Sequence, residues 1–388
     1  MAKKIEVGGF TISKEQKSLV NAVLNSQRIT YGPMTEAFEK KWAELHDVKY
    51  ALFCNSGTSA LQVSLHALKD KYHWADGDEV IIPAVTFVAT MNIVLQNNLK
   101  PVFVDVDPVL FNINPDLIEE AITKKTRAII VVHLLGQPAE MDRIMQIAKK
   151  HKLRVIEDSC ETVGASFRGR KVGSWGDVAC FSTYASHLIV TGVGGFACTN
   201  NSDLAVRIKG LYNHGRDGIY HSIDSDDKVN MVNSRFRFIH SGYSYRATEM
   251  EAALGLGHMK TFKEEFKQRN KNAETLTNGL RWLEEEGKLI LPFTHYDATH
   301  SFMLYGIVVV GNERDRLINF LEEEEIMTRY MMPLLSQPIT KKLFGNLLPK
   351  FPVAKFLDKH GFLIGVQPDL SEKDLKKVIK KFYQFYYD

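Results

Sequence analysis

Cysteine is scarce in this sequence of 388 residues, and the cysteines that it has are widely spaced. They stand at Cys54, Cys160, Cys180 and Cys198, and no two of them form a CxxC pair. A disulfide framework, a zinc site and an iron–sulfur site each have characteristic cysteine spacings that this chain lacks. We therefore expect a cytoplasmic protein from a reducing compartment, without a metal site.

The sequence also lacks a strong charge imbalance and a long apolar segment. Its net charge is +3, with 24% charged and 45% hydrophobic residues, an ordinary composition for a globular protein. A charge this small gives no reason to expect binding to nucleic acid or membranes. Residues 1–6 lack the apolar stretch of a signal peptide. The longest uncharged stretch, 178–202, is rich in Ser, Thr and Gly, which favours buried core and an active-site loop over a membrane span.

What the sequence does have is a regular alternation of apolar runs and helical patterns. Two helices are predicted first, from a Ser13–Gln16 capping box to about Leu24 and over 35–45. Apolar runs then indicate buried strands at 50–54, 79–83, 101–105, 127–133 and 153–157, with helical patterns between them at 60–68, 88–96, 115–123 and 141–150. This alternation predicts an α/β fold with an open, mostly parallel sheet covered on both faces, extended by strands near 178–182 and 195–199.

The pattern changes after about Lys260. A long polar helix is predicted over 262–286, followed by a strand at 303–310 and helices near 314–324 and 371–386. We therefore predict a large α/β domain over residues 1–260 and a smaller α+β domain over 261–388. No Pro/Gly-rich linker marks the boundary between them.

One motif between a predicted strand and a predicted helix has the composition of a phosphate site. Residues 54–60 read CNSGTSA, and Gly57 permits a close backbone approach. The amides and hydroxyls of Thr58 and Ser59 would stand at a helix N-terminus, where anions bind readily. An ordinary helix N-cap explains the same residues equally well.

Two further motifs follow predicted strands and carry groups that titrate. Residues 155–161 read VIEDSCE, and residues 181–187 read FSTYASH. Ligands of open parallel sheets bind at the carboxyl ends of the strands, so Asp158, Glu161 and His187 are candidates for one site. The imidazole of His187 can move protons near neutral pH. A solvated or helix-capping Glu161 and a satisfied core His187 are the alternatives.

Residues 181–187 and 191–195 (TGVGG) resemble the segment that carries the cofactor lysine in the DegT-type sugar aminotransferases, which use pyridoxal phosphate (PLP). Most of that family has lysine where His187 stands, and within the family the exchange of this lysine for histidine marks the sugar 3-dehydratases. Residues 157–161, EDSCE, also resemble the dehydratase pattern, because the aminotransferases commonly have His or Gln where Glu161 stands. Two independent positions therefore favour the same reaction.

The resemblance covers nearly the whole chain from Ser26 onward and implies a fold-type-I PLP enzyme. It implies that Asp158 faces the pyridine nitrogen of the cofactor and keeps it protonated, and that Phe87 stacks on the pyridine ring. A core phenylalanine is the alternative for Phe87. It further implies that the cofactor phosphate is bound by Gly57, Thr58, Ser59 and Ser182.

The resemblance also implies a substrate loop and a shared active site. Residues 212–217, YNHGRD, are similar to a loop near the substrate, where His214 and Arg216 would contact a nucleotide sugar. An exposed loop charge is the alternative for Arg216. Residues 242–253 are similar to a segment that crosses a dimer interface, where Ser244 would touch the partner's PLP phosphate. A homodimer with shared active sites is therefore implied.

Three positions depart from the family pattern. Val193 replaces a usual glutamate, Ser244 replaces asparagine, and Thr183 replaces a usual aromatic residue. Residues 328–338 are more similar to the aminotransferases than to the dehydratases. The absence of an iron–sulfur pattern favours the dehydratases that lack such a cluster.

The resemblance thus implies an enzyme that removes the 3-hydroxyl of a nucleotide-linked 4-keto-6-deoxyhexose, with GDP-4-keto-6-deoxymannose as the expected substrate. PLP or pyridoxamine phosphate (PMP) would be the cofactor and L-glutamate the amino donor. His187 would move the proton, and Glu161 would orient His187 or raise its basicity. One alternative is a sugar aminotransferase that uses another lysine, such as Lys171 or Lys209. A non-catalytic regulatory or binding paralogue is the other.

Overall fold

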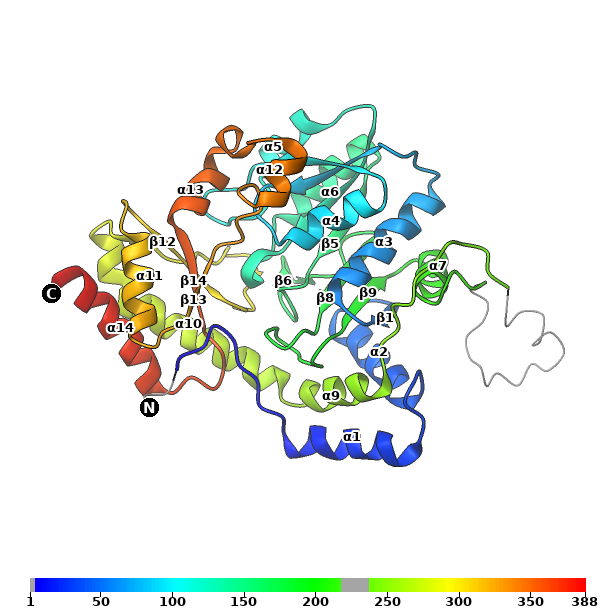
Figure 1. Cartoon of the computed structure of the whole chain (residues 1–388), viewed down its shortest axis with the longest axis horizontal. Helices are drawn as coiled ribbons and strands as arrows, with labels where there is room; N and C mark the ends of the chain where they lie inside the picture. Colours follow the sequence, from blue (N-terminus) through cyan, green and yellow to red (C-terminus); the bar gives the residue numbers. More distant parts are fainter. Residues whose placement is uncertain (1–3, 218–236) are drawn as a thin grey trace.

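The computed structural model describes residues 4–217 and 237–388. Within them, the largest sheet has seven strands in the order β1-β9-β8-β5-β4-β2-β3 (Figure 1). The strands are β1 (Tyr50–Cys54), β2 (Glu79–Pro83), β3 (Lys100–Val104), β4 (Thr126–Val132), β5 (Arg154–Asp158), β8 (Val178–Ser182) and β9 (Gly195–Thr199). Each agrees within one residue with a run that the apolar pattern predicts.

Strand β9 is the one strand of this sheet that runs against the others. It pairs antiparallel with both β1 and β8, whereas β8, β5, β4, β2 and β3 pair in parallel. Strand β1 consequently points the same way as β8. The predicted α/β fold with a mostly parallel sheet is confirmed, and β1, β5 and β8 all end at the same edge.

Helices cover both faces of this sheet, as predicted. One face is covered by α3 (Gly57–Lys71), α4 (Val88–Gln96) and α7 (Ser202–Tyr212). The other is covered by α2 (Pro33–Leu45) and α6 (Met141–His151), with α5 (Pro115–Ile118) and the 3₁₀ turns η1 (Glu119–Ala121) and η2 (Leu134–Gly136) nearby. The predicted helix over 115–123 is thus shorter than expected, because its second half is a 3₁₀ turn.

Two buried aromatic residues of α2 fix that helix to the sheet. Trp42 stacks on Phe196 of β9 with 4.2 Å between ring centroids, and Phe38 meets the same ring edge-on at 4.8 Å. Both side chains are fully buried. Each buried ring contributes several kcal/mol to the free energy of folding, which is roughly what its truncation to alanine would cost.

The N-terminal helix α1 (Lys14–Ser26) begins at the predicted capping box. The hydroxyl of Ser13 accepts the amide of Gln16, and the Gln16 side chain accepts the amide of Ser13. Helix α1 lies alongside α9 (Glu249–Met259) (Figure 1), and the Gln16 amide group also donates to the carbonyl of Leu254.

A second, antiparallel sheet lies in the C-terminal part of the chain. Its order is β10-β12-β14-β13, and it packs against α10 (Phe262–Glu285), α11 (Arg314–Glu323) and α14 (Glu372–Tyr387). Its strands are β10 (Leu289–Ile290), β12 (Tyr305–Val309), β13 (Thr328–Tyr330) and β14 (Gly361–Ile364). The predicted helices and the strand at 303–310 are confirmed here, and the domain boundary near residue 260 stays a prediction.

Several short elements were not predicted from the sequence. They are α12 (Pro338–Phe344), η3 (Leu348–Lys350), α13 (Pro352–His360) and a small sheet of β11 (Ala298–Thr299), β6 (Ser166–Phe167) and β7 (Arg170–Lys171). No helix in the described part of the chain is long and apolar enough to cross a membrane.

The cysteines lie close together on one side of the large sheet, on or next to the strands β1, β9, β8 and β5. Cys54, Cys180 and Cys198 lie on the adjacent strands β1, β8 and β9 and are buried, and Cys160 follows β5. All are free thiols, and burial raises the pKa of each of them. They therefore pack as small, neutral side chains.

Gly195 allows close packing at the sheet edge where β1, β5 and β8 end. A Cβ atom at this position would lie 2.4 Å from the amide nitrogen of Gly57 and 2.5 Å from the carbonyl oxygen of Phe181. We expect Gly195→Ala to lower the free energy of unfolding by about 1–3 kcal/mol, because backbone atoms on both sides must move. Urea denaturation measures this change.

Gly9→Ala is the matched control for that substitution. Its added Cβ would have only an ordinary contact, at 3.8 Å from a carboxylate oxygen of Asp369. We expect a change within about 0.5 kcal/mol. Equal stabilities of Gly195→Ala and the parent protein would contradict the close packing at this edge.

Candidate active site

The N-terminus of α3 meets the end of β8 at a very short separation. A Cβ atom added to Gly57 would lie 2.8 Å from both the Cys160 sulfur and the Ser182 Cβ atom. Only glycine therefore allows the first turn of α3 to approach Ser182 and the segment after β5 this closely. The structure thus brings together Gly57 and Ser182, as the sequence predicts, and adds Cys160 to them.

The first turn of α3 presents donors at this point. Ser56 is the N-cap, and its hydroxyl accepts the amide of Ser59 at 3.0 Å, while the Ser59 hydroxyl lies 2.9 Å from that of Ser56. The amides of Gly57 and Thr58 precede the first intrahelical hydrogen bond, so they face out of the helix end. The Thr58 side chain is exposed. This arrangement fits the phosphate group of a cofactor.

Asp158 is held in a buried position at the end of β5. Its carboxylate accepts the Thr90 hydroxyl at 2.8 Å and the amide of Cys160 at 3.3 Å, and Thr90 is in turn 2.8 Å from the Thr86 hydroxyl. Burial raises the pKa of Asp158, whereas the hydrogen bonds from Thr90 and Cys160 lower it. A carboxylate fixed in this way fits the protonated ring nitrogen of PLP.

Phe87 is not a core residue. It is the N-cap of α4, four residues beyond β2, and 61% of its side chain is exposed. The alternative of a core phenylalanine is therefore wrong. An exposed aromatic ring at the edge where the strands end is available to stack on a planar ligand, and stacking on the cofactor stays a prediction.

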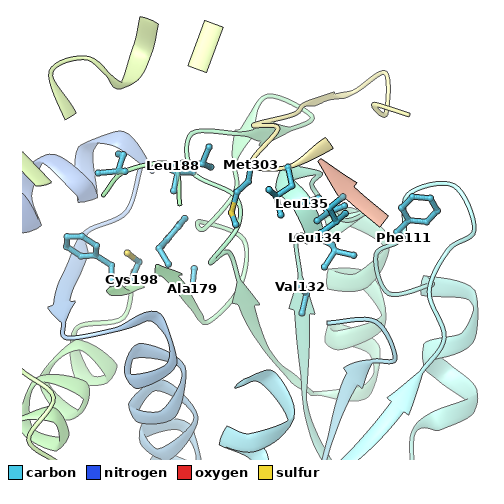
Figure 2. Close-up of a cluster of buried hydrophobic side chains, with 14 of the residues drawn as sticks. Phe111, Val132, Leu134, Leu135, Ala179, Leu188, Cys198 and Met303 are labelled. Carbon is cyan, nitrogen blue, oxygen red and sulfur yellow. The ribbon is translucent and has the colours of Figure 1, made fainter. Parts of the chain in front are cut away.

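His187 lies in a loop whose next residues are anchored in the core. Leu188 is 2% exposed and belongs to the buried cluster that includes Ala179 and Cys198 (Figure 2). The His187 ring meets the Tyr184 ring edge-on at 5.9 Å, and its buried Nδ1 atom has no hydrogen-bond partner among the residues that the structure describes. Burial, and then the charge of Arg269, lowers the pKa of His187 to about 4. The imidazole is therefore neutral at physiological pH and can accept a proton.

Glu161 is held by a backbone amide rather than by His187. Its carboxylate accepts the amide of Leu135 at 2.7 Å, and within residues 4–217 and 237–388 no hydrogen bond joins it to His187. Burial raises the pKa of Glu161 to about 7, opposed by the Leu135 amide and reinforced by Asp158. The pKa of His187 is lowered by burial and by Arg269, and an action of Glu161 on His187 stays a prediction.

The site residues predicted in segments 212–217 and 242–253 lie only partly together. The Arg246 guanidinium donates to the Ser244 hydroxyl at 3.4 Å and lies 3.1 Å from His214 Nε2. The adjacent Tyr245 carbonyl accepts the amide of Asn55 at 2.8 Å, which places this group beside the N-terminus of α3. Arg216 lies elsewhere in the loop, with its guanidinium 5.6 Å from the Phe238 ring centre, and is half-buried rather than exposed.

The lysines proposed as alternative anchors have other partners. Lys209 donates to the Tyr31 hydroxyl at 3.1 Å, and Lys171 donates to the Gly164 carbonyl at 3.4 Å. Over the described ranges, no lysine contributes to the pKa of Glu161 or His187. Neither Lys171 nor Lys209 therefore acts on the charge of Glu161 or His187.

Three residues of the site were not predicted from the sequence. Thr90 binds Asp158, Arg246 binds Ser244 and His214, and Arg269 acts on His187. Arg246 stands in the same segment as Ser244 and could have been suspected from its charge. Thr90 and Arg269 lie inside helical patterns that carry no signal of a functional site.

Comparisons with known proteins agree on one family. The model of the DegT/DnrJ/EryC1/StrS aminotransferase family matches residues 11–383. The chain is 31% identical to dTDP-4-dehydro-2,6-dideoxy-D-glucose 3-dehydratase of Saccharopolyspora spinosa, covering 98% of this chain and 86% of that protein. It is 33% identical to GDP-perosamine synthase of Caulobacter vibrioides, covering 88% and 87%.

A solved structure is similar over almost the whole length. A variant of GDP-4-keto-6-deoxymannose-3-dehydratase with bound GDP-perosamine superposes with a TM-score of 0.88, at 26% identity, covering 97% of this chain and 99% of that one. The chain therefore belongs to the DegT/DnrJ/EryC1/StrS aminotransferase family and has the fold-type-I architecture. Its cofactor is PLP or PMP, and the helix N-terminus at Gly57 and the buried Asp158 fit that group.

The burial of Glu161 makes stability depend on pH. Its pKa is raised from 4.5 to about 7 on folding, so the protonated form is favoured in the folded state. The stability that it contributes is complete below about pH 4.5 and is lost as the pH rises through about 7. Glu161→Gln, which stays neutral, should be more stable than the parent by roughly 1–3 kcal/mol at pH 8 and nearly equal to it at pH 4.5.

Urea denaturation at the two pH values measures this difference. Glu120→Gln, at an exposed position of η1, serves as the control and should show no pH-dependent gain. A Glu161→Gln variant that gains the same stability at both pH values would show that Glu161 is already ionised in the folded protein at low pH.

Proposed function

We propose that this member of the family is a PLP/PMP-dependent 3-dehydratase of a nucleotide-linked 4-keto-6-deoxyhexose. The single observation that carries the proposal is His187, which stands where the family has its cofactor lysine and is neutral in its half-buried position. A neutral imidazole can accept and return a proton but cannot hold the cofactor covalently. L-Glutamate would be the amino donor.

Bound PMP would supply an amine for the sugar ketone and a ring that withdraws electrons. The N-terminus of α3 and Ser182 would hold its phosphate group, Asp158 would keep its ring nitrogen protonated, and Phe87 would cover the ring. The imidazole of His187 would accept a proton in the site and return it to the departing 3-hydroxyl.

The half-buried position of His187, which lines a cavity, suits a group that exchanges protons with a ligand. With its pKa near 4, the imidazole stays in the base form across physiological pH. Glu161, whose pKa lies near 7, can be protonated or ionised at the same pH. Glu161 binds the Leu135 amide and not the imidazole, so we assign it to contact with a sugar hydroxyl rather than to His187.

The relatives support both the proposal and one alternative. One relative is named a dTDP-sugar 3-dehydratase, and the superposed structure is a GDP-4-keto-6-deoxymannose-3-dehydratase. GDP-perosamine synthase is similar to this chain to the same degree. The second candidate is therefore a sugar aminotransferase, which is also favoured by residues 328–338. We keep GDP-4-keto-6-deoxymannose as the expected substrate, with a cytoplasmic homodimer acting in surface-polysaccharide or deoxysugar synthesis.

The products of one reaction test the proposal. The purified protein is incubated with PLP, excess L-glutamate and GDP-4-keto-6-deoxymannose, and the products are followed by mass spectrometry and an ammonia assay. We expect a sugar that has lost one oxygen atom and one ammonia for each product molecule. A 4-amino sugar without ammonia would instead establish the aminotransferase.

His187→Asn is the matched variant for this assay. It should lower turnover by about 10²–10⁴-fold, the usual contribution of a positioned acid or base, while PLP binding stays close to that of the parent. His300→Asn, at a buried histidine stacked on Phe302, controls for the loss of a buried imidazole. Turnover of His187→Asn near the parental value would exclude His187 as the base.

Borohydride reduction tests the absence of a lysine anchor. After incubation with PLP alone, we expect reduction to leave the chain without covalently attached cofactor, because His187 cannot form a reducible bond with an aldehyde. Intact-protein mass spectrometry measures the attachment. A stoichiometric adduct mapped to a lysine, for example Lys171 or Lys209, would overturn the proposal in favour of the aminotransferase.

A further inference from the structure

The segment that precedes α9 is held against α3 by a side chain. The Tyr243 hydroxyl accepts the side-chain amide of Gln62 at 3.1 Å and lies 3.0 Å from His66 Nδ1. Gln62 and His66 are separated by one turn of α3, so they face the same side of that helix. One face of α3 therefore binds a single hydroxyl through two side chains.

The backbone around Tyr243 connects separate parts of the candidate site. The Tyr243 amide donates to the Leu211 carbonyl at 2.7 Å, and the Tyr243 carbonyl accepts the His214 amide at 2.7 Å. The Tyr245 carbonyl accepts the amide of Asn55, the residue before the N-cap of α3, at 2.8 Å. A shift of this segment would therefore disturb both the loop at His214 and the turn that begins α3.

Tyr243 also satisfies a buried amide group. Gln62 is 3% exposed, and within the described part of the chain its Oε1 atom has no hydrogen-bond partner, while its Nε2 atom donates to Tyr243. The Tyr243 ring stacks on Tyr245 with 4.7 Å between ring centroids and meets the His66 ring edge-on at 5.6 Å. Loss of the hydroxyl alone would keep this ring packing but leave the Gln62 amide group without a partner.

The order of donors makes the contact with His66 sensitive to a proton. The Gln62 amide nitrogen can only donate, so the Tyr243 oxygen accepts there and its hydroxyl hydrogen is left for His66 Nδ1. Nδ1 can accept only when it carries no proton, whereas an imidazolium donates from both nitrogens. Neutral His66 therefore completes the network, and protonated His66 breaks it.

The charged groups around His66 act in both directions. Burial lowers the pKa of His66, and the carboxylate of Asp70 on the same helix raises it. The charges of His240, from the segment before Tyr243, and of Lys69 lower it further. A cavity of about 460 Å³, which His73 also lines, opens beside His66 and lets protons exchange with solvent. His66 is therefore neutral near pH 7.5 and gains a proton only in acid.

We propose that Tyr243 is a positioning residue for the cofactor phosphate site, and that its hydrogen bonds to Gln62 and neutral His66 hold segment 243–246 against α3. Protonation of His66 releases this segment, so cofactor affinity depends on a group about 14 Å along the helix from Gly57. The inference rests on the cofactor phosphate lying at the N-terminus of α3. It holds equally for a dehydratase and an aminotransferase, so a failed dehydration assay leaves it standing.

PLP binding to full-length Tyr243→Phe tests the hydroxyl. We expect the Kd for PLP, measured by absorbance titration at pH 7.5, to rise about three- to tenfold, as for the loss of one hydrogen bond. At pH 5, where protonation of His66 weakens the contact in the parent as well, the ratio of the two Kd values should fall. A Kd within 1.5-fold of the parent at pH 7.5, or a ratio that is the same at both pH values, would overturn the proposal.

Tyr72→Phe is the matched control for that substitution. Tyr72 is the C-cap of the same helix, and among the described residues its hydroxyl has no hydrogen bond. We expect its Kd for PLP to equal that of the parent at both pH values. A rise like that of Tyr243→Phe would show that loss of any tyrosine hydroxyl near α3 weakens binding, and would overturn the specific role of Tyr243.

His66→Asn separates the hydrogen bond from the proton. The asparagine oxygen can accept the Tyr243 hydroxyl at the position of Nδ1, but it does not titrate. We expect a Kd for PLP within about twofold of the parent at pH 7.5 and a smaller loss of affinity than the parent shows on going to pH 5. A loss equal to that of the parent would exclude His66 as the proton-sensitive group.

Hydrogen–deuterium exchange of the parent without cofactor tests the proposal without any variant. After correction for intrinsic exchange rates, the peptide that contains the Asn55 amide should be less protected at pH 5 than at pH 7.5, because its Tyr245 partner is released. Equal protection at the two pH values would overturn the proposal, even if Tyr243→Phe fails to fold.

Discussion

The close approach of α3 to the end of β8 and the start of β9 is the constraint on which the rest of the site depends. Gly57 and Gly195 face each other there, and a Cβ atom on either would meet neighbouring atoms at less than 3 Å. Because the two glycines allow contact, the donors of the α3 N-terminus, Ser182 and the segment after β5 share one edge. Separation of α3 from this edge would take the phosphate donors away from Asp158.

Burial then decides the charge state of each group that reaches this edge. It raises the pKa of Asp158 and Glu161, and it lowers the pKa of His187 and Arg269. Each of these shifts costs folding free energy, and hydrogen bonds from Thr90 and the Leu135 amide offset part of it. Titratable groups in such positions concentrate at functional sites, and here a neutral imidazole lies near the charged guanidinium of Arg269.

The fold was largely predictable because its signal is local. Continuous apolar runs and the helical patterns between them located all strands of the large sheet, and the capping box located the start of α1. Strand β9 shows the limit, because a buried strand has the same apolar pattern in either direction. The second half of the helix predicted over 115–123 was wrong because a 3₁₀ turn has nearly the same spacing of apolar residues as an α-helix.

The sequence located the candidate groups that follow the strands, but not the contacts that these groups make. The sequence determined which groups follow the strands, namely the glycine of the α3 turn, the acids after β5 and a histidine in place of lysine after β8. Only the tertiary structure decided that Glu161 binds the Leu135 amide and that Arg269 faces His187. The reason is physical: strand order fixes where a residue lies, whereas the direction of its side chain depends on segments far away in the sequence that pack against it.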